Sequence, residues 1–138
     1  MNNMQRDIGL LMDFQTAIGR IEKYVAEIDF DGFSSNEMIQ DAVIRNITII
    51  GEATTKLSDD LKAKHPNIEW HAIAGMRHRL VHDYNGVNLK LIWNTVKTMV
   101  PEFKVSVTEI QAEINVEDGS GGQASGGPSA RSVIPKPR

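Results

Sequence analysis

The sequence of 138 residues contains no cysteine. This absence excludes a disulfide framework, a thiolate nucleophile and any zinc or iron–sulfur site that is built on sulfur. The sequence also lacks an apolar run near the roughly 18 residues that a membrane span needs, and MNNMQRDIGL at its start lacks the pattern of a signal peptide. We therefore expect a soluble, cytoplasmic protein with no membrane segment.

The composition is that of one globular domain with an uneven charge. Apolar residues make up 41% and charged residues 24% of the chain, which are ordinary values for folded domains. Residues 119–138 carry three basic and no acidic residues, so residues 1–118 hold 12 basic and 18 acidic ones. Such an acidic body disfavours non-specific nucleic-acid binding, which depends on many phosphate contacts, but it is compatible with a local basic site.

The C-terminal segment has a different composition from the rest. Residues 117–138 read EDGSGGQASGGPSARSVIPKPR, and five of the eleven glycines and three of the five prolines lie after residue 118. A segment of this kind buries too little apolar area to offset the entropy that is lost on ordering it. We predict a folded domain over residues 1–116 and a flexible tail over residues 117–138.

Apolar residues recur at steps of three and four along residues 1–116, which is the period of a helix. The clearest such stripe begins at Ile8 and ends at Ile28. Ser34 and Glu37 have the spacing of a capping box, which predicts that the second helix begins at Ser34.

The second half of this region contains further helix signals. Ser58 is expected to cap a short turn, and a third helix is predicted over residues 69–82. A fourth helix begins near Asn88, and Pro101 either kinks that helix or starts a fifth. No stretch has the period of a strand. The predicted fold is therefore an all-α antiparallel bundle of four to five helices.

The third predicted helix carries most of the histidine in the protein. Its segment WHAIAGMRHRLVHDY, at residues 70–84, holds three of the four histidines. At about 100° per residue, a continuous helix would align a polar stripe made of His71, Gly75, His78 and His82. Gly75 would let another backbone or a ligand approach closely. Another face, expected to be the core side, consists of Ile73, Met76 and Leu80.

Arg77, His82 and Tyr84 are the main candidate functional residues of this helix. A phosphodiester substrate needs an arginine to hold its phosphate and a histidine to take or give a proton near neutral pH. RNA also supplies its own nucleophile, the 2′-hydroxyl. The alternative is structural: an exposed arginine or histidine is often only a solvated side chain, and a tyrosine is often an aromatic at the edge of the core.

His78 and His82 also have the i, i+4 spacing of two metal ligands on one helix face. The intervening sequence HRLVH lacks the glutamate of the HExxH motif, so it supplies no base of the zinc-protease kind. We therefore predict no metal site and no cofactor.

The sequence RHRLVHDY at residues 77–84 resembles the Arg-x-x-x-x-His-x-Tyr motif of HepT-like toxins, which belong to the HEPN superfamily. The resemblance covers about residues 5–115. Close relatives usually have asparagine directly after the motif arginine, where this chain has His78. The similarity extends to four blocks of the sequence, one of which contains the motif. They are DAVIRNITIIGEA at 41–53, KHPNIEW at 64–70, GMRHRLVHDY at 75–84 and VNLKLIWNTVKTMVPEF at 87–103.

The resemblance implies a HEPN-like helical bundle that forms a homodimer, with the two motif helices facing each other across a cleft. It implies a metal-independent endoribonuclease, the toxin of a type VII toxin–antitoxin pair with an MNT-type nucleotidyltransferase as antitoxin. By position, the catalytic residues are Arg77 and His82, and Tyr84 is the residue to which such antitoxins add AMP. His78 and Glu52 take supporting or RNA-binding roles, a polar contact between helices being the alternative for Glu52.

Two other functions fit the same residues. In the first, the helix binds a nucleotide or a protein partner without catalysis, and Arg77 is only a clamp for an anion. In the second, the histidine stripe packs at a helix interface of a purely structural dimer. Replacing His82 by alanine separates the first from a nuclease, because binding would survive the change and cleavage would not.

Overall fold

The fold consists of α-helices. The structure is a computed structural model, and it describes residues 2–81 and 88–119. Within these ranges there are eight helices and no strand. The helices are α1 (Asn3–Val25), α2 (Phe30–Ser34), α3 (Glu37–Lys56), α4 (Asp59–Lys64), α5 (Trp70–Ala74), α6 (Met76–Val81), α7 (Leu89–Lys97) and α8 (Met99–Gly119).

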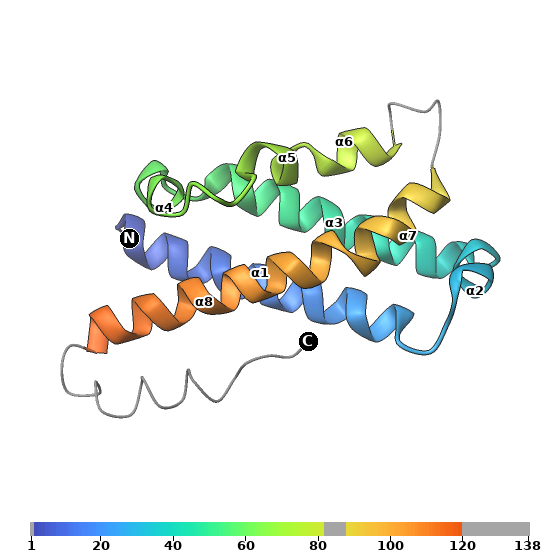
Figure 1. The fold of residues 1–138 in the computed structure, drawn as a ribbon, viewed down its shortest axis with the longest axis horizontal. Helices are drawn as coiled ribbons and strands as arrows, with labels where there is room; N and C mark the ends of the chain where they lie inside the picture. The colour runs from blue at the N-terminus through green and yellow to red at the C-terminus, as the bar shows by residue number, and fades with distance from the viewer. Residues whose placement is uncertain (1, 82–87, 120–138) are drawn as a thin grey trace.

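The predicted all-α class is confirmed, and the helix count is higher than expected because four short helices connect the longer ones. Helix α1 packs against α3 and α8, while α5 and α6 lie along α3 (Figure 1). Within the described ranges, no helix is long and apolar enough to cross a membrane.

The core lies where α1, α3 and α8 meet. Each of these helices places a row of apolar side chains there, as their period of three and four residues requires. Phe14 of α1 is fully buried and meets Phe103 of α8 edge to face, with 4.9 Å between the ring centroids. Aromatic pairs in this geometry contribute about 0.5–1.5 kcal/mol beyond the area that they bury. The largest buried side chains of α1 and α3 are Phe14, Leu11, Ile18, Ile21, Ile47, Ile50 and Val43.

The predicted start of the second helix at Ser34 is wrong by two to three residues. Ser34 is the last residue of the short helix α2, and its hydroxyl donates to the carbonyl oxygen of Asp31. Helix α3 begins instead at Glu37, and the side chain of Asn36 accepts a hydrogen bond from the backbone of Ile39 at 3.0 Å. At the end of α2, Ser34 and Ser35 both donate their hydroxyls to the carbonyl oxygen of Asp31, so Asn36 is the first residue free to cap α3.

The predicted cap at Ser58 is confirmed. Its hydroxyl accepts a hydrogen bond from the backbone N–H of Leu61 at 3.1 Å, and α4 begins at the next residue. The same serine donates twice to the buried carboxylate of Asp7 on α1, at 2.9 Å from its backbone nitrogen and 2.6 Å from its hydroxyl. The Asp7 carboxylate therefore holds the start of α4 against α1.

Of the two alternatives for Pro101, the structure has a new helix rather than a kink. Helix α7 begins after Asn88, whose side chain accepts from the backbone of Leu91, and it ends at Lys97. Helix α8 begins at Met99, so Pro101 lies in its first turn, where a missing backbone N–H costs no helical hydrogen bond.

Candidate active site

Helices α5 and α6 carry the histidine-rich segment and lie along α3 (Figure 1). The loop before α5 is held by Trp70, whose indole N–H donates to the carbonyl oxygen of His65 at 3.1 Å. The Trp70 ring also meets Phe103 of α8 edge to face, with 6.2 Å between centroids. These contacts position the start of α5 between α3 and α8.

The predicted single helix over residues 69–82 is interrupted at Gly75. The backbone N–H of Gly75 donates to the carbonyl oxygen of His71 in α5 at 3.1 Å. The carbonyl oxygen of Gly75 accepts from the backbone N–H of Arg79 in α6 at 3.2 Å. The hydrogen-bond pattern of α5 therefore ends at Gly75, and that of α6 starts there. The expected stripe through His71, Gly75 and His78 is thus not a stripe on one continuous helix.

Helix α6 presents its apolar residues to the core and its charged residues to solvent. Met76 and Leu80 are each only 1% exposed, and Ile73 of α5 is buried beside them, which confirms the expected core side. Arg77 and His78 are exposed on the outer part of α6. Their neighbours Met76 and Leu80 fill the core, so Arg77 and His78 lie on the solvent side of the same helix.

The predicted catalytic His82 and the predicted AMP acceptor Tyr84 lie outside the described residues. Their geometry relative to Arg77 therefore stays a prediction. The same holds for the metal-ligand spacing of His78 and His82. Among the residues that the structure does describe, no group of three or more His, Asp or Glu side chains is arranged to hold a metal ion.

Glu52, the predicted supporting residue on α3, is exposed. It directly follows Gly51, and a β-carbon at Gly51 would lie 3.1 Å from the carbonyl oxygen of Ala74 at the end of α5. Glu52 therefore lies near the junction of α5 and α6. Gly75, expected to permit a close approach, does not do so within this chain, because a β-carbon there would meet only His71 at an ordinary 3.6 Å.

Asn46 is a buried polar residue that the sequence reasoning did not single out. Its side chain is 2% exposed and its Nδ2 donates to the carbonyl oxygen of Ala42, while its Oδ1 is a buried acceptor with no hydrogen-bond partner among the described residues. The signal was present in the sequence, because Asn46 interrupts the apolar series of Val43, Ile47 and Ile50 on the core side of α3.

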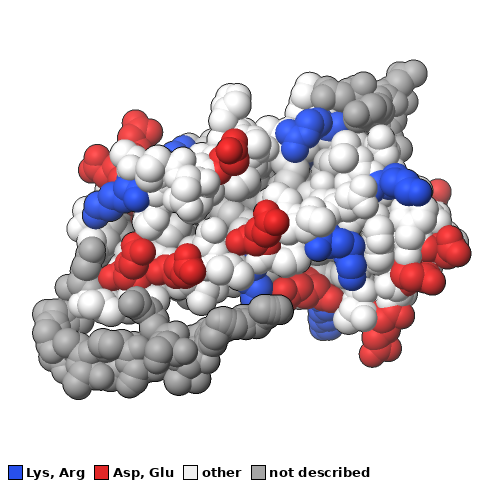
Figure 2. Space-filling model, viewed as in Figure 1, with Lys and Arg blue, Asp and Glu red and all other residues white. Residues whose placement is uncertain are grey.

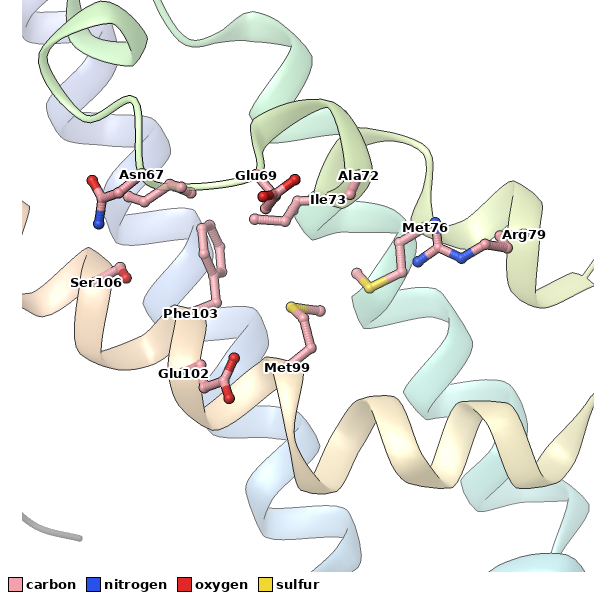
Figure 3. Close-up of a pocket in the computed structure, with 11 residues that line it drawn as sticks. Asn67, Glu69, Ala72, Ile73, Met76, Arg79, Met99, Glu102, Phe103 and Ser106 are labelled. Carbon is pink, nitrogen blue, oxygen red and sulfur yellow. The ribbon is translucent and has the colours of Figure 1, made fainter.

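A groove of about 280 Å³ opens between α5–α6 and α8, beside the motif helix (Figure 3). Apolar side chains from both walls form its inner surface, and the sulfur atoms of Met76 and Met99 point toward each other. Glu69, Arg79 and Glu102 stand around it. The sequence reasoning missed this groove, because one wall is formed within residues 67–79 and the other within residues 99–106.

Acidic and basic side chains are distributed unevenly around this groove. In the view of Figure 1, acidic side chains follow α8, and basic ones gather toward α6 and α7 (Figure 2). The negative charge of the folded body therefore lies partly along α8, whereas α6 carries Arg77, His78 and Arg79. The outer face of α6 is thus a local basic site on an acidic body, the kind of site that can hold a phosphate.

Residues 14–110 match the family described as Ribonuclease HepT-like. The chain belongs to this family. The match covers more than half of the chain and includes every helix from α2 to α7. It confirms the family that the sequence resembles, and with it the expected enzyme class of ribonuclease.

Curated relatives agree with this membership. The chain is 43% identical over 94 residues to the "Probable ribonuclease HepT" of Thermococcus cleftensis, covering 68% of this chain and 86% of the relative. It is 36% identical over 104 residues to a "Putative RNase" of Methanocaldococcus jannaschii, covering 75% and 95%. A "Putative RNase" of Caldanaerobacter subterraneus is 40% identical over 86 residues, covering 62% and 77%. No solved structure shows a significant match to the chain.

Proposed function

We propose that this HepT-like chain is a metal-independent endoribonuclease that acts as the toxin of a type VII toxin–antitoxin pair. The single observation that supports this most is the placement of Arg77 and His78 on the exposed side of α6, while Met76 and Leu80 of the same short helix fill the core. The motif arginine and the histidine after it thus lie on the surface of the bundle, where a phosphodiester can reach them.

In the proposed reaction, Arg77 binds the scissile phosphate and stabilises the charge that builds on its oxygens. A histidine, His82, takes the proton of the 2′-hydroxyl, whose oxygen forms a bond to the adjacent phosphorus. The bond between phosphorus and the 5′-oxygen breaks, and that oxygen receives a proton. The products are a 2′,3′-cyclic phosphate and a 5′-hydroxyl end.

A homodimer would complete this site. The residues of one chain supply one Arg77 and one His82, and two chains whose motif helices face each other would supply two of each. One histidine can then act as the base while the other acts as the acid. The supporting residues His78 and Glu52 would line the same cleft. The specific activity should therefore fall when the chain is diluted below the dissociation constant of the dimer. Sedimentation at the same concentrations measures that constant.

The antitoxin in this proposal is an MNT-type nucleotidyltransferase that transfers AMP to Tyr84. The phenolic oxygen attacks the α-phosphorus of a nucleoside triphosphate, and pyrophosphate leaves. The added nucleotide puts negative charge and bulk two residues from His82, where it competes with RNA phosphate for Arg77. Neutralisation then needs no change in the fold.

The test is cleavage of a mixed-sequence RNA in the presence of EDTA by the parent chain and by its Arg77→Ala and His82→Ala variants. We expect cyclic phosphate ends from the parent and a loss of at least about 100-fold in both variants, in line with typical general acid–base contributions of about 10²–10⁴. His71→Ala is the matched control, because His71 is an exposed histidine on α5, across the break at Gly75.

Three results would contradict the proposal. They are 5′-phosphate products, activity that is abolished by the chelator, and full activity in His82→Ala. If neither the parent nor any variant cleaves RNA, but the parent binds it and Arg77→Ala does not, the alternative of a non-catalytic binding module is the better description.

A further inference from the structure

The groove between α5–α6 and α8 has no role in the proposed cleavage reaction. We propose that it binds a single nucleobase of the RNA next to the cut site, and that its carboxylates select a base with adjacent hydrogen-bond donors, namely guanine. This inference rests on the proposed function, since it assigns a specificity site to the same enzyme.

The size and surface of the groove suit one base. Its volume of about 280 Å³ lies at the lower limit of small-molecule sites, which run from ~300 to 1,000 Å³. Flat aromatic rings such as nucleobases pack well on sulfur and aromatic side chains. Met99 is partly exposed and supplies sulfur to the groove, while the almost completely buried Met76 and Phe103 line its inner surface (Figure 3).

The charged residues of the groove lack partners of their own. The carboxylates of Glu69 and Glu102 lie on opposite walls, one before α5 and the other on α8 (Figure 3). Arg79 lies beside Met76, at the end of the groove away from both carboxylates (Figure 3). None of these three side chains has a hydrogen-bond or ion-pair partner among the residues that the structure describes. They are therefore available to a ligand.

Two carboxylates and one guanidinium indicate which base fits. An ionised carboxylate only accepts hydrogen bonds, so it favours a base edge that donates. Guanine presents a ring N–H and an amino N–H side by side, which one carboxylate can accept together. Uracil presents a single donor between two carbonyl oxygens, and those oxygens would face the carboxylates. Adenine and cytosine present their amino group beside an acceptor nitrogen and rank between the two.

The position of the groove connects it to the motif. Arg79 lines the groove and lies two residues after Arg77 on α6, on a different side of the same helix. An RNA strand whose scissile phosphate binds Arg77 can therefore place the neighbouring phosphate at Arg79 and the attached base in the groove. The separation of the two sites is fixed by α6 itself, so the preferred base has a constant position relative to the cut.

The first experiment maps cut sites in a mixed-sequence RNA by sequencing the product ends. The parent chain should show guanine enriched at one fixed position beside the cut. Glu69→Gln combined with Glu102→Gln keeps the shape of the groove but replaces one acceptor oxygen of each carboxylate by a donating amide nitrogen, so that two adjacent donors are no longer accepted together. The double variant should reduce that enrichment by about ten-fold or more. Glu109→Gln is the matched control, because Glu109 is exposed on α8 and does not line the groove.

The second experiment measures nucleotide binding in the groove by NMR and does not depend on cleavage. In the full chain with ¹³C-methyl methionine, guanosine 3′-monophosphate at millimolar concentration should shift the methyl signals of Met76 and Met99, and uridine 3′-monophosphate should not. Met12 and Met38 are internal controls, because they are 60% and 80% exposed and lie outside the groove.

The outcomes separate this inference from the proposed function. If the parent cleaves RNA but the double glutamine variant has the same base preference, the groove inference is wrong and the nuclease stands. If the parent does not cleave but the methionine signals respond to guanosine monophosphate alone, the groove binds a base and the nuclease proposal is wrong. Equal responses to both nucleotides, or none, overturn the inference.

One competing occupant can be tested in the same spectra. The C-terminal segment is basic, and it would fit the carboxylates by charge. If Arg131→Ala combined with Lys136→Ala moves the signals of Met76 and Met99 in the absence of nucleotide, the groove is filled by this chain itself, and the base-binding inference is overturned.

Discussion

Gly51 of α3 lies against the carbonyl oxygen of Ala74, the last residue of α5: a β-carbon on Gly51 would be 3.1 Å from that oxygen. Because α6 begins only two residues after Ala74, this contact determines how closely the motif helix approaches the core. A glycine on one helix thus sets the position of Arg77 on another.

Gly51→Ala should therefore lower stability. Overpacking a tight contact costs about 1–3 kcal/mol, and the helix propensity of alanine offsets up to ~1 kcal/mol of this. We expect a net loss of about 1–2 kcal/mol in urea unfolding. Gly19→Ala is the control, because nothing lies within 4 Å of a β-carbon at Gly19 on α1, and it should gain about 0.5–1 kcal/mol. Equal stability of the two variants would show that α5 moves freely relative to α3.

Asp7→Ala should destabilise the junction of α1 and α4. The Asp7 carboxylate accepts hydrogen bonds from the backbone and the hydroxyl of Ser58, and it is 4% exposed. Its removal leaves partly buried donors without a partner, which costs about 1–3 kcal/mol. The free energy of unfolding in urea measures this loss. Asp13→Ala, at an exposed position on the same helix, should change it by less than about 0.5 kcal/mol.

Two substitutions of similar size at Asn46 should have opposite effects on the free energy of unfolding. Asn46→Leu removes a buried acceptor that has no partner in residues 2–81 and 88–119, so the stability of this variant should equal or exceed that of the parent. Asn46→Asp places a charge at a position that is 2% exposed, and should cost at least about 3 kcal/mol near neutral pH. A large loss of stability in Asn46→Leu would mean that Oδ1 makes an essential contact in solution.

Tyr84→Phe separates catalysis from neutralisation. The variant keeps the ring but lacks the oxygen to which AMP would be attached. The proposed cleavage reaction gives that oxygen no role, so the variant should cleave RNA within about two-fold of the parent. Co-expression with an MNT-type nucleotidyltransferase should no longer silence it, and intact mass should show no adduct of AMP. If the antitoxin silences the variant as well as the parent, modification of Tyr84 is not the mechanism.

Much of the fold could be predicted from local sequence. The apolar period identified α1, α3 and α7. The cap at Ser58 and the start of a helix near Asn88 lie where they were expected, because the start of a helix depends on a polar side chain and the next three residues. The start of α3 was misplaced, since the short helix α2 uses Ser34 for its own end. The break at Gly75 was missed, because the residues on both sides of it have helical propensity and an apolar period.

The sequence by itself determined the family, the all-α class and the order of the motif residues, because these depend on residue identity and on spacing along the chain. Only the tertiary structure decided that Gly51 rather than Gly75 makes the close helix contact, and that Arg79 shares a groove with Glu102. These relationships join residues that are more than twenty positions apart. They depend on how whole helices pack, and no local pattern encodes the distance between two helices.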